Sequence, residues 1–480
     1  MRACVRYALV LCAAMPTLLG AQGFGIYEQG TCAMGRAGAG VAAPCSDGSA
    51  MFFNPAGLAG LTGGRLTIGV TLLDVQGGFT DDLFQQKTKL DDPLLAIPQV
   101  YISYAATPKL GVGVGLFAPY GLETNWPTAF DGRFAGYKNI LKSVYIQPTL
   151  AYQVSPRLSL GGGFDIVLGN VELNQRLDLA TTPVPASILP VPPGTQPPVF
   201  GQFGFPPGTD FADAHLEATK TTVAAHFGAT FKVSDQLSFG ANFLTQAKFD
   251  YSGTASFTRV PTGIVVPATI TVGALTIPAG FPIDTLVGGA PGSGGLDLFN
   301  PSTGVFRTQP VTTTIKNPSQ LALGLAYKLA NGWTLLGDYQ LTWWSQFNEL
   351  DITFPQDLSG LLNRKLFENY HNTSGFRFGA EWAKDAKWTF RGGYLHHDGA
   401  APAETVTPLL PEGQRNEFTL GTTVKLGAAL SADLAYQYIR QNDRRGRTRE
   451  PLIGAATTGL NNGLYDFHAH LFGVSLSYAF

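Results

Sequence analysis

The sequence predicts an all-β fold, a 14-stranded antiparallel transmembrane β-barrel with an N-terminal plug in its lumen. Three observations lead to this prediction. Tight turns alternate with long loops, the strands between them have one apolar and one polar face, and an apolar N-terminal stretch lacks any alternation. Single-chain outer-membrane barrels have an even number of strands, short periplasmic turns and longer outer loops.

The tight turns share a signature, in which a bulky apolar residue and then a small residue open the next strand. The copies are Lys109-Leu110-Gly111, Arg157-Leu158-Ser159, Gln236-Leu237-Ser238, Gly332-Trp333-Thr334, Lys387-Trp388-Thr389 and Ala429-Leu430-Ser431. A long polar or Pro-rich excursion separates each copy from the next. Six turns and seven loops make thirteen connections, and thirteen connections join fourteen strands.

The expected strands alternate between an oily and a polar face, which is the period of a β-strand. In chain order they are residues 65–73, 99–107, 111–120, 143–155, 158–173, 221–233, 237–257, 313–329, 333–354, 376–383, 388–397, 417–426, 430–440 and 469–480. Phe376 and Phe378, for example, share one face and Arg377 has the other. We expect the charged faces to point into the lumen. The strand length of about ten residues fits a tilted membrane strand.

Aromatic residues gather near the strand ends, where interfacial girdles are expected. The residues assigned to the girdles are Tyr101, Tyr104, Tyr152, Trp333, Trp343, Trp388, Tyr478 and Phe480. Two outer loops, residues 181–214 and 259–310, are long and apolar enough to predict a folded rim.

Composition agrees with a membrane barrel. Charged residues make up 14% of the chain, well below the usual quarter. No apolar run after the N-terminus approaches the roughly twenty residues of a spanning helix, so any crossing must be made by strands. A net charge of −2 gives no basic footprint for nucleic acid. We therefore expect an outer-membrane protein with no nucleic-acid partner.

The chain divides into three parts. Residues 1–21 predict a secretory signal peptide, with Arg2 and Arg6 around a short apolar stretch and small residues at Gly20-Ala21. Residues 22–60 are rich in Gly and Ala and show no alternation, and they are too long for a linker and too apolar for disorder. A fourteen-strand lumen is wider than side chains can fill. We therefore predict a plug at 22–60 and a barrel at 61–480.

Cleavage of the signal peptide leaves Cys32 and Cys45, both in the predicted plug. In an oxidising periplasm a pair of cysteines predicts a disulfide, and two buried free thiols are the alternative. His396-His397-Asp398 is the densest titratable cluster. Strand neighbours point to opposite faces, so we expect an ordinary rim or lumen position and no metal. With no catalytic motif present, we expect neither enzyme activity nor a cofactor.

Pro119 lies near the top of the third expected strand, in Phe117-Ala118-Pro119-Tyr120-Gly121. Proline lacks the N–H that a ladder needs, so it predicts either a bulge or gap in the wall or simply the start of the next loop. Asn54-Pro55-Ala56, just before the first strand, is by itself an ordinary turn signal.

The ordered set of features resembles the FadL/TodX family of outer-membrane transporters for long-chain fatty acids and other hydrophobic compounds. The set comprises the signal peptide, the Gly-rich plug, Asn54-Pro55-Ala56, fourteen strands and the terminal Tyr478-Ala479-Phe480. Further matches are Gly23-Phe24, Gly35-Arg36-Ala37, Tyr120-Gly121-Leu122, Trp344-Ser345-Gln346-Phe347 and Trp388-Thr389-Phe390-Arg391. The resemblance covers essentially the whole mature chain.

The resemblance implies capture of substrate by the outer loops, binding in a lumen pocket above the plug, and sideways release into the bilayer. It implies a ligand contact for Phe24, a carboxylate contact for Arg176 and a lateral opening at Pro119, Tyr120 and Gly121. The family lysine that would accompany the arginine is out of register here, and only Lys365 is near. A neutral hydrocarbon therefore stays open as the substrate beside a fatty acid.

From these features we predict passive transport of hydrophobic molecules, with long-chain fatty acids first. The alternatives are an uptake channel for aromatic or alkane hydrocarbons within the same family and a general aqueous porin. The expected partners are these small molecules, outer-membrane lipid, and the barrel assembly machinery through Phe480. We expect a monomer.

Overall fold

The computed structural model describes residues 23–82, 84–91, 94–180, 182–184, 194, 196–272, 275–289, 295–357, 360–446 and 462–480. The predicted signal peptide, residues 1–21, lies outside the described residues, as does Gln22 at the start of the predicted plug. None of the helices in the described ranges is long and apolar enough to cross a membrane.

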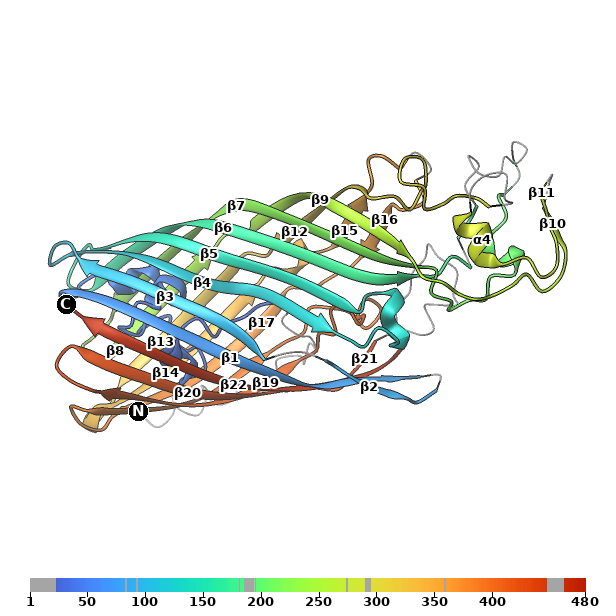
Figure 1. Cartoon of the computed structure of the whole chain (residues 1–480). Helices are drawn as coiled ribbons and strands as arrows, with labels where there is room; N and C mark the ends of the chain where they lie inside the picture. The colour runs from blue at the N-terminus through green and yellow to red at the C-terminus, as the bar shows by residue number, and fades with distance from the viewer. Residues whose placement is uncertain are drawn as a thin grey trace.

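All the described strands except the β10–β11 pair form a single closed antiparallel barrel (Figure 1). Its first strand, β1 (Gly64–Asp81), pairs with its last, β22 (Gly463–Ala479), from Arg65↔Ala479 to Asp81↔Gly463. This pairing closes the wall and confirms the predicted 14-stranded barrel. Between them the wall contains, in chain order, β3 (Leu95–Ala105), β4 (Leu110–Asn125), β5 (Lys138–Gln153), β6 (Leu158–Leu177), β7 (Ala212–Lys232), β8 (Leu237–Leu244) with β9 (Ala247–Arg259), β12 (Gln309–Asn317) with β13 (Gln320–Lys328), β14 (Trp333–Thr342) with β15 (Glu349–Thr353), β16 (Arg364–Phe367) with β17 (Thr373–Ala383), β18 (Trp388–His397), β19 (Arg415–Lys425), and β20 (Leu430–Gln441) with β21 (Arg444–Gly446). A short strand, β2 (Lys87–Lys89), pairs with the outer end of β1.

The two faces of the wall follow the predicted alternation. On β17 the outward Phe378 is 58% exposed, whereas the neighbouring Arg377 points inward and is 2% exposed. Large apolar side chains face outward along β6, β7 and β22, where lipid replaces water, and polar side chains line the lumen. The girdle prediction is wrong for Tyr101, which is buried and donates a hydrogen bond to the carbonyl oxygen of Gln29.

Three of the predicted strands are interrupted. The breaks lie between β8 and β9, at Pro318-Ser319 between β12 and β13, and at residues 343–348 between β14 and β15. Pro318 has no N–H for the ladder. Within the last break, the 3₁₀ turn η5 (Trp344–Gln346) leaves the wall and buries the indole of Trp344. Period-2 alternation does not predict such inward turns, because the flanking residues keep the same pattern.

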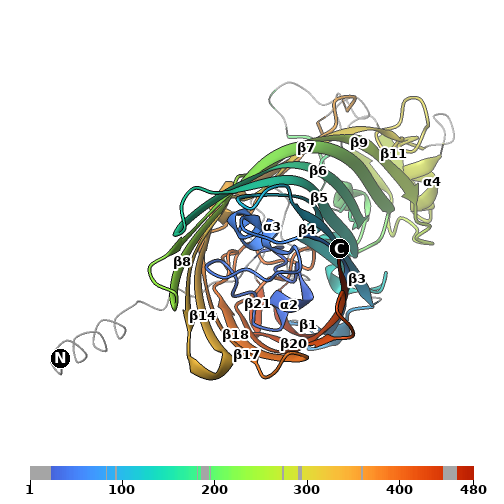
Figure 2. The ribbon, with the colours of Figure 1, turned by 90° about the vertical axis from the view of Figure 1, so that its left-hand side faces the viewer.

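The N-terminal segment, residues 23–60, lies inside the barrel (Figure 2). We call it the plug. It contains two four-residue helices, α2 (Thr31–Met34) and α3 (Ala50–Phe53), and the 3₁₀ turn η1 (Pro55–Leu58), and most of its side chains are buried. The apolar, unpatterned stretch therefore fills the lumen, as predicted.

The Asn54-Pro55-Ala56 turn attaches the plug to the wall. The Asn54 side chain accepts a hydrogen bond from the Ala56 N–H at 3.1 Å and donates to the carbonyl oxygens of Val41 at 2.7 Å and Ala229 at 2.9 Å. The turn lies so close to β7 that the residue opposite it must be glycine. A Cβ on Gly228 would lie 2.1 Å from Asn54 Oδ1.

We expect Gly228→Val to displace this turn and open a leak. The substitution costs Asn54 its wall contact, a hydrogen bond worth about 0.5–1.5 kcal/mol, and single-channel recordings in planar bilayers should show openings that the unaltered protein lacks. Gly162→Val is the matched control, because a Cβ there has no neighbour closer than 3.6 Å. A folded Gly228→Val barrel that stays closed would contradict this role of the turn.

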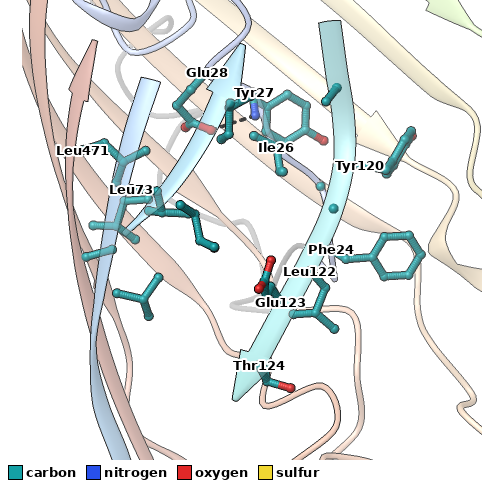
Figure 3. Close-up of a pocket in the computed structure, with 18 of the residues that line it drawn as sticks. Phe24, Ile26, Tyr27, Glu28, Leu73, Tyr120, Leu122, Glu123, Thr124 and Leu471 are labelled. Atoms are coloured by element: carbon teal, nitrogen blue, oxygen red, sulfur yellow. Dashed lines mark hydrogen bonds between the residues drawn. The ribbon is translucent and has the colours of Figure 1, made fainter. Parts of the chain in front are cut away.

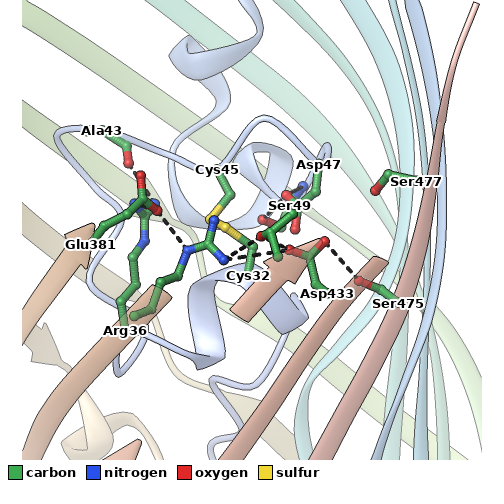
Figure 4. Close-up of a disulfide and its surroundings, with 12 residues drawn as sticks. Cys32, Arg36, Ala43, Cys45, Asp47, Ser49, Glu381, Asp433, Ser475 and Ser477 are labelled. Atoms are coloured by element: carbon green, nitrogen blue, oxygen red, sulfur yellow. Dashed lines mark hydrogen bonds and ion pairs between the residues drawn. A yellow bond between two sulfur atoms is a disulfide. The ribbon is translucent and has the colours of Figure 1, made fainter. Parts of the chain in front are cut away.

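The plug also contains a disulfide and an ion-pair network (Figure 4). Cys32 and Cys45 are bonded, with their Cα atoms 6.3 Å apart. Arg36 donates to the Ala43 carbonyl oxygen at 2.7 Å and lies 3.5 Å from Glu381 of the wall. Glu381 in turn accepts from Arg391 Nε at 2.7 Å. These contacts join the middle of the plug to β17 and β18.

The two long outer loops form a rim beyond one end of the barrel (Figure 1). Their described parts contain a hairpin of β10 (Ile270–Val272) and β11 (Leu275–Ile277), the 3₁₀ turn η3 (Phe200–Phe203) and a short helix, α4 (Ile283–Gly288). Buried apolar side chains from both loops pack together, among them Phe200, Phe205, Phe211, Ile283, Leu286 and Phe306.

Candidate functional site

The wall is incomplete between β3 and β4. Their ladder ends at Val100↔Leu116, although β4 continues to Asn125 beside β5. The β4–β5 register shifts between Phe117 and Tyr120, around Pro119. The residues of β4 beyond Leu116 therefore have no partner on β3, and we call this opening the gap. Pro119 lies within the strand, not at the start of the following loop.

The first residues of the plug occupy the inner side of the gap. The Ile26 N–H donates to the Pro119 carbonyl oxygen at 2.8 Å, and the Gly121 N–H donates to the Phe24 carbonyl oxygen at 2.9 Å. The Gln29 side chain exchanges two hydrogen bonds of 2.9 Å with the backbone of Ala118. The N-terminal segment thus satisfies part of the backbone that β3 leaves unpaired.

Phe24 lies in an aromatic cage beside the gap. Its ring contacts the rings of Trp344, Phe347 and Tyr120, with centroids 4.8, 5.4 and 6.0 Å away. Gly23, with φ +58°, leaves no room for a side chain, since a Cβ would lie 2.6 Å from the Trp344 ring. The inward turn η5 therefore positions both residues.

Glu412, in the loop between β18 and β19, holds the start of the plug. One of its carboxylate oxygens accepts hydrogen bonds from the N–H groups of Gly23 at 2.8 Å and Ala400 at 2.7 Å, and the other accepts from Ala401 at 3.3 Å. Burial raises the pKa of Glu412 above its ordinary value, and these three amides oppose the shift.

A cavity of about 320 Å³ connects the lumen with the gap (Figure 3). Leu73 of β1 and Leu471 of β22 line one side, and Leu122 and Glu123 of β4 line the other. The remaining apolar lining comes from the plug and the neighbouring strands, and includes Phe24, Ile26, Val75, Leu95, Ile97, Val144, Leu410, Ile439 and Phe467. Such a mostly apolar surface suits an apolar ligand.

Charged side chains line two parts of this cavity. At the gap, Lys142 of β5 pairs with Glu123 at 2.8 Å. In the lumen, Gln437 Nε2 donates to Glu28 of the plug at 2.8 Å and to Glu417 of β19 at 2.5 Å. Arg415, two residues before Glu417, also lines the cavity.

The structure brings together some of the predicted site residues. Phe24, Tyr120 and Gly121 all line the cavity, and Pro119 is hydrogen-bonded to the plug at its edge. Arg176 is not among the lining residues. It lies near the outer end of β6, 3.4 Å from Asp213 and 4.0 Å from Asp210.

The other charged candidates from the sequence also have partners. Lys365 pairs with Glu349 at 2.8 Å. His397 is buried and stacks on Tyr27, whereas His396 contacts Asn416, so the two rings point to opposite faces as the strand pattern predicts. Within the described residues, one group of three side chains lies close enough together to hold a metal ion, namely Cys32, Cys45 and Asp47. Both sulfurs of this group are in the disulfide.

Sequence reasoning misses three residues of this site. The pattern places Trp344 in a continuous strand, Glu412 in a plain loop, and Arg415 just before an expected strand. Only the Trp344-Ser345-Gln346-Phe347 match points toward one of them. Glu412 and Arg415 acquire their surroundings from segments far away in the sequence, such as the start of the plug.

A family model for "Outer membrane protein transport protein (OMPP1/FadL/TodX)" matches residues 11–480 of the chain. The chain belongs to this family. This member of the OMPP1/FadL/TodX family is thus an outer-membrane transport protein and not an enzyme.

Relatives of this family member match along nearly their whole length. The chain is 22% identical over 486 residues to outer membrane protein P1 of Haemophilus influenzae, covering 96% of this chain and 95% of that protein. It is 23% identical over 471 residues to a long-chain fatty acid transport protein of Salmonella typhi, with coverages of 95% and 94%.

Solved structures show the same fold. A Pseudomonas aeruginosa FadL homologue matches with a TM-score of 0.72 at 18% identity, over 96% of this chain and 100% of that one. The toluene transporter TodX of Pseudomonas putida matches with a TM-score of 0.63 at 16% identity, over 97% and 100%.

Proposed function

We propose that this protein carries hydrophobic molecules, with long-chain fatty acids first, passively across the outer membrane. The outer loops capture the substrate, the cavity binds it, and the gap between β3 and β4 releases it into the bilayer. The observation that carries this proposal is the mostly apolar cavity that runs from the lumen to the gap. A relative named for long-chain fatty acid transport supports the same substrate class.

Release through the wall is favourable for an apolar substrate. Each methylene returned to water costs about 0.8 kcal/mol, so a path from the cavity into lipid avoids a large penalty. Phe24, which lines the cavity beside the gap, is proposed to contact the ligand as it passes. A carboxylate contact at Arg176 is what the resemblance implies, and there the ligand would compete with Asp213, which lies 3.4 Å from the guanidinium.

Uptake by cells tests the function. Cells whose fatty-acid uptake depends on this protein should take up oleate, whereas cells with an empty vector should not. The protein purified from such cells should carry lipid that mass spectrometry identifies. Uptake of toluene or hexadecane in place of oleate would favour the hydrocarbon alternative. Ion conductance like that of a wide porin in the unaltered protein would overturn the transporter proposal.

We also propose that the barrel assembly machinery recognises Phe480 and that the barrel functions as a monomer. The Phe480 ring is exposed on the outer wall, and its backbone pairs with Gly64, with N···O distances of 2.7 and 2.9 Å. The barrel closes within one chain. Size-exclusion chromatography with light scattering tests the monomer, and assembly of a Phe480→Ala variant tests the signal.

A further inference from the structure

We propose that Arg415 is the cation that recognises the carboxylate of a fatty acid in the cavity, an inference that rests on the proposed function. Arg415 begins β19 and lies opposite His397 of β18 and Gln441 of β20. Side chains alternate along β19, so Arg415 shares the lumen face with the buried Glu417. Arg415, Glu417 and Gln441 line the cavity together, on the side of β19 and β20.

The guanidinium of Arg415 has no ion pair and no hydrogen bond with any described residue. The carboxylates of the acidic residues around it already accept hydrogen bonds from other groups. Three backbone amides bind Glu412, and Gln437 donates to both Glu28 and Glu417. Lys142, the other lysine or arginine in the described lining, pairs with Glu123. Arg415 is therefore the one of these two cations left to receive an external anion.

An arginine in this position suits a carboxylate. Its planar guanidinium stays protonated and offers N–H donors in a fork that matches two carboxylate oxygens. Hydrogen bonds between two charged groups are stronger than neutral ones, and the mostly apolar lining lowers the local dielectric. With the head group at Arg415, the tail lies along the apolar lining between the lumen and the gap, which includes Ile439, Leu471, Leu73 and Val75.

Arg176 offers less to a ligand. Two aspartates lie within 4.0 Å of it, and its guanidinium carbon lies 5.7 Å from the centre of the Tyr137 ring. A second carboxylate would have to compete with Asp213 and Asp210 for the same donors. Arg176 also lies outside the cavity lining. We therefore expect substitution of Arg415 to weaken binding of the carboxylate and substitution of Arg176 to leave it unchanged.

Binding of two tail-matched ligands, oleate and oleyl alcohol, to the purified full-length protein tests the proposal. Arg415→Met should weaken oleate binding at least about tenfold, equal to about 1.4 kcal/mol. Oleyl alcohol should bind as it does to the unaltered protein, because the alcohol carries no charge. Arg415→Lys should recover part of the oleate affinity, since lysine keeps the charge without the fork.

Two further variants separate ligand recognition by Arg415 from its effect on the charge balance of the lumen. Arg415→Met with Glu417→Gln removes both charges, so any misfolding caused by an unbalanced Glu417 is relieved while the loss of oleate binding should remain. Arg440→Met on β20 is the matched control, because this arginine pairs with Asp443 at 2.8 Å and belongs to the outward face of the same region. Its oleate affinity should equal that of the unaltered protein.

Several results would overturn the proposal. Restored oleate binding in the Arg415→Met and Glu417→Gln double variant would show that Arg415 only balances Glu417. Equal losses of oleate and oleyl alcohol would show a role in shape or folding. A selective loss in Arg176→Met, with Arg415→Met unaffected, would assign the carboxylate to the other arginine. If the unaltered protein binds neither ligand, the proposed function itself fails.

Discussion

Deletion of residues 24–57 is expected to turn a barrel that passes almost no ions into one that conducts like a wide porin. The plug occupies the lumen and buries Met51, Phe52 and Phe53 there. A fourteen-strand barrel without such a filling has a lumen wider than its own side chains can close. The wall pairs with itself from β1 to β22, so the deleted barrel should still fold. Single-channel recording in planar bilayers measures the change.

A deletion of similar kind in the rim serves as the control. Within residues 264–281, the described residues 264–272 and 275–281 contain β10 and β11, in the rim beyond the end of the barrel. Removing them should leave the barrel closed to ions. If the plug deletion conducts no better than the rim deletion, the lumen is closed by something other than the plug.

The barrel could be predicted because its signals are local. Alternation fixes which face of a strand meets lipid, and a tight turn before Leu430 or Leu158 marks a strand start within a few residues. The plug was predictable for the complementary reason, since an apolar stretch without alternation needs a place away from both lipid and water. The sequence leaves both a disulfide and two free thiols possible for Cys32 and Cys45, because it does not give the distance between the two sulfur atoms.

The contacts of the site could not be predicted in the same way. Arg176 looked free because its partners, Asp210 and Asp213, come from a loop and from the next strand. Trp344 sits within a pattern that fits a strand, yet the chain turns inward there and cages Phe24. Whether Arg415 has a partner depends on every side chain around the cavity. Charge in a sequence identifies candidates, and only the arrangement in space shows which of them is already paired.

Replacement of both Pro119 and Gly121 by valine is expected to abolish fatty-acid uptake while leaving ligand binding in place. Pro119 has no N–H, and β4 beyond Leu116 has no ladder with β3. Valine at position 119 restores a donor. A Cβ at position 121 would meet only the end of the Ile26 side chain at 3.0 Å and the Leu141 carbonyl oxygen at 3.6 Å, so the fold can accommodate it.

Uptake of labelled oleate by cells, together with oleate binding by the purified variant, separates release from capture. Pro148→Val with Gly162→Val is the matched control. Pro148 of β5 pairs with Val114 of β4, and the β5–β6 ladder continues on either side of it, at Ile146↔Ile166 and Thr149↔Gly163. Gly162 of β6 pairs with Leu150 of β5 and Phe227 of β7. That variant should transport normally. An apolar ligand that cannot pass the wall must enter water to leave the cavity, which costs about 0.8 kcal/mol for each methylene. Because of this cost, closing the gap should stop transport without weakening ligand binding. Undiminished uptake by a folded Pro119→Val and Gly121→Val protein would place the exit elsewhere in the barrel.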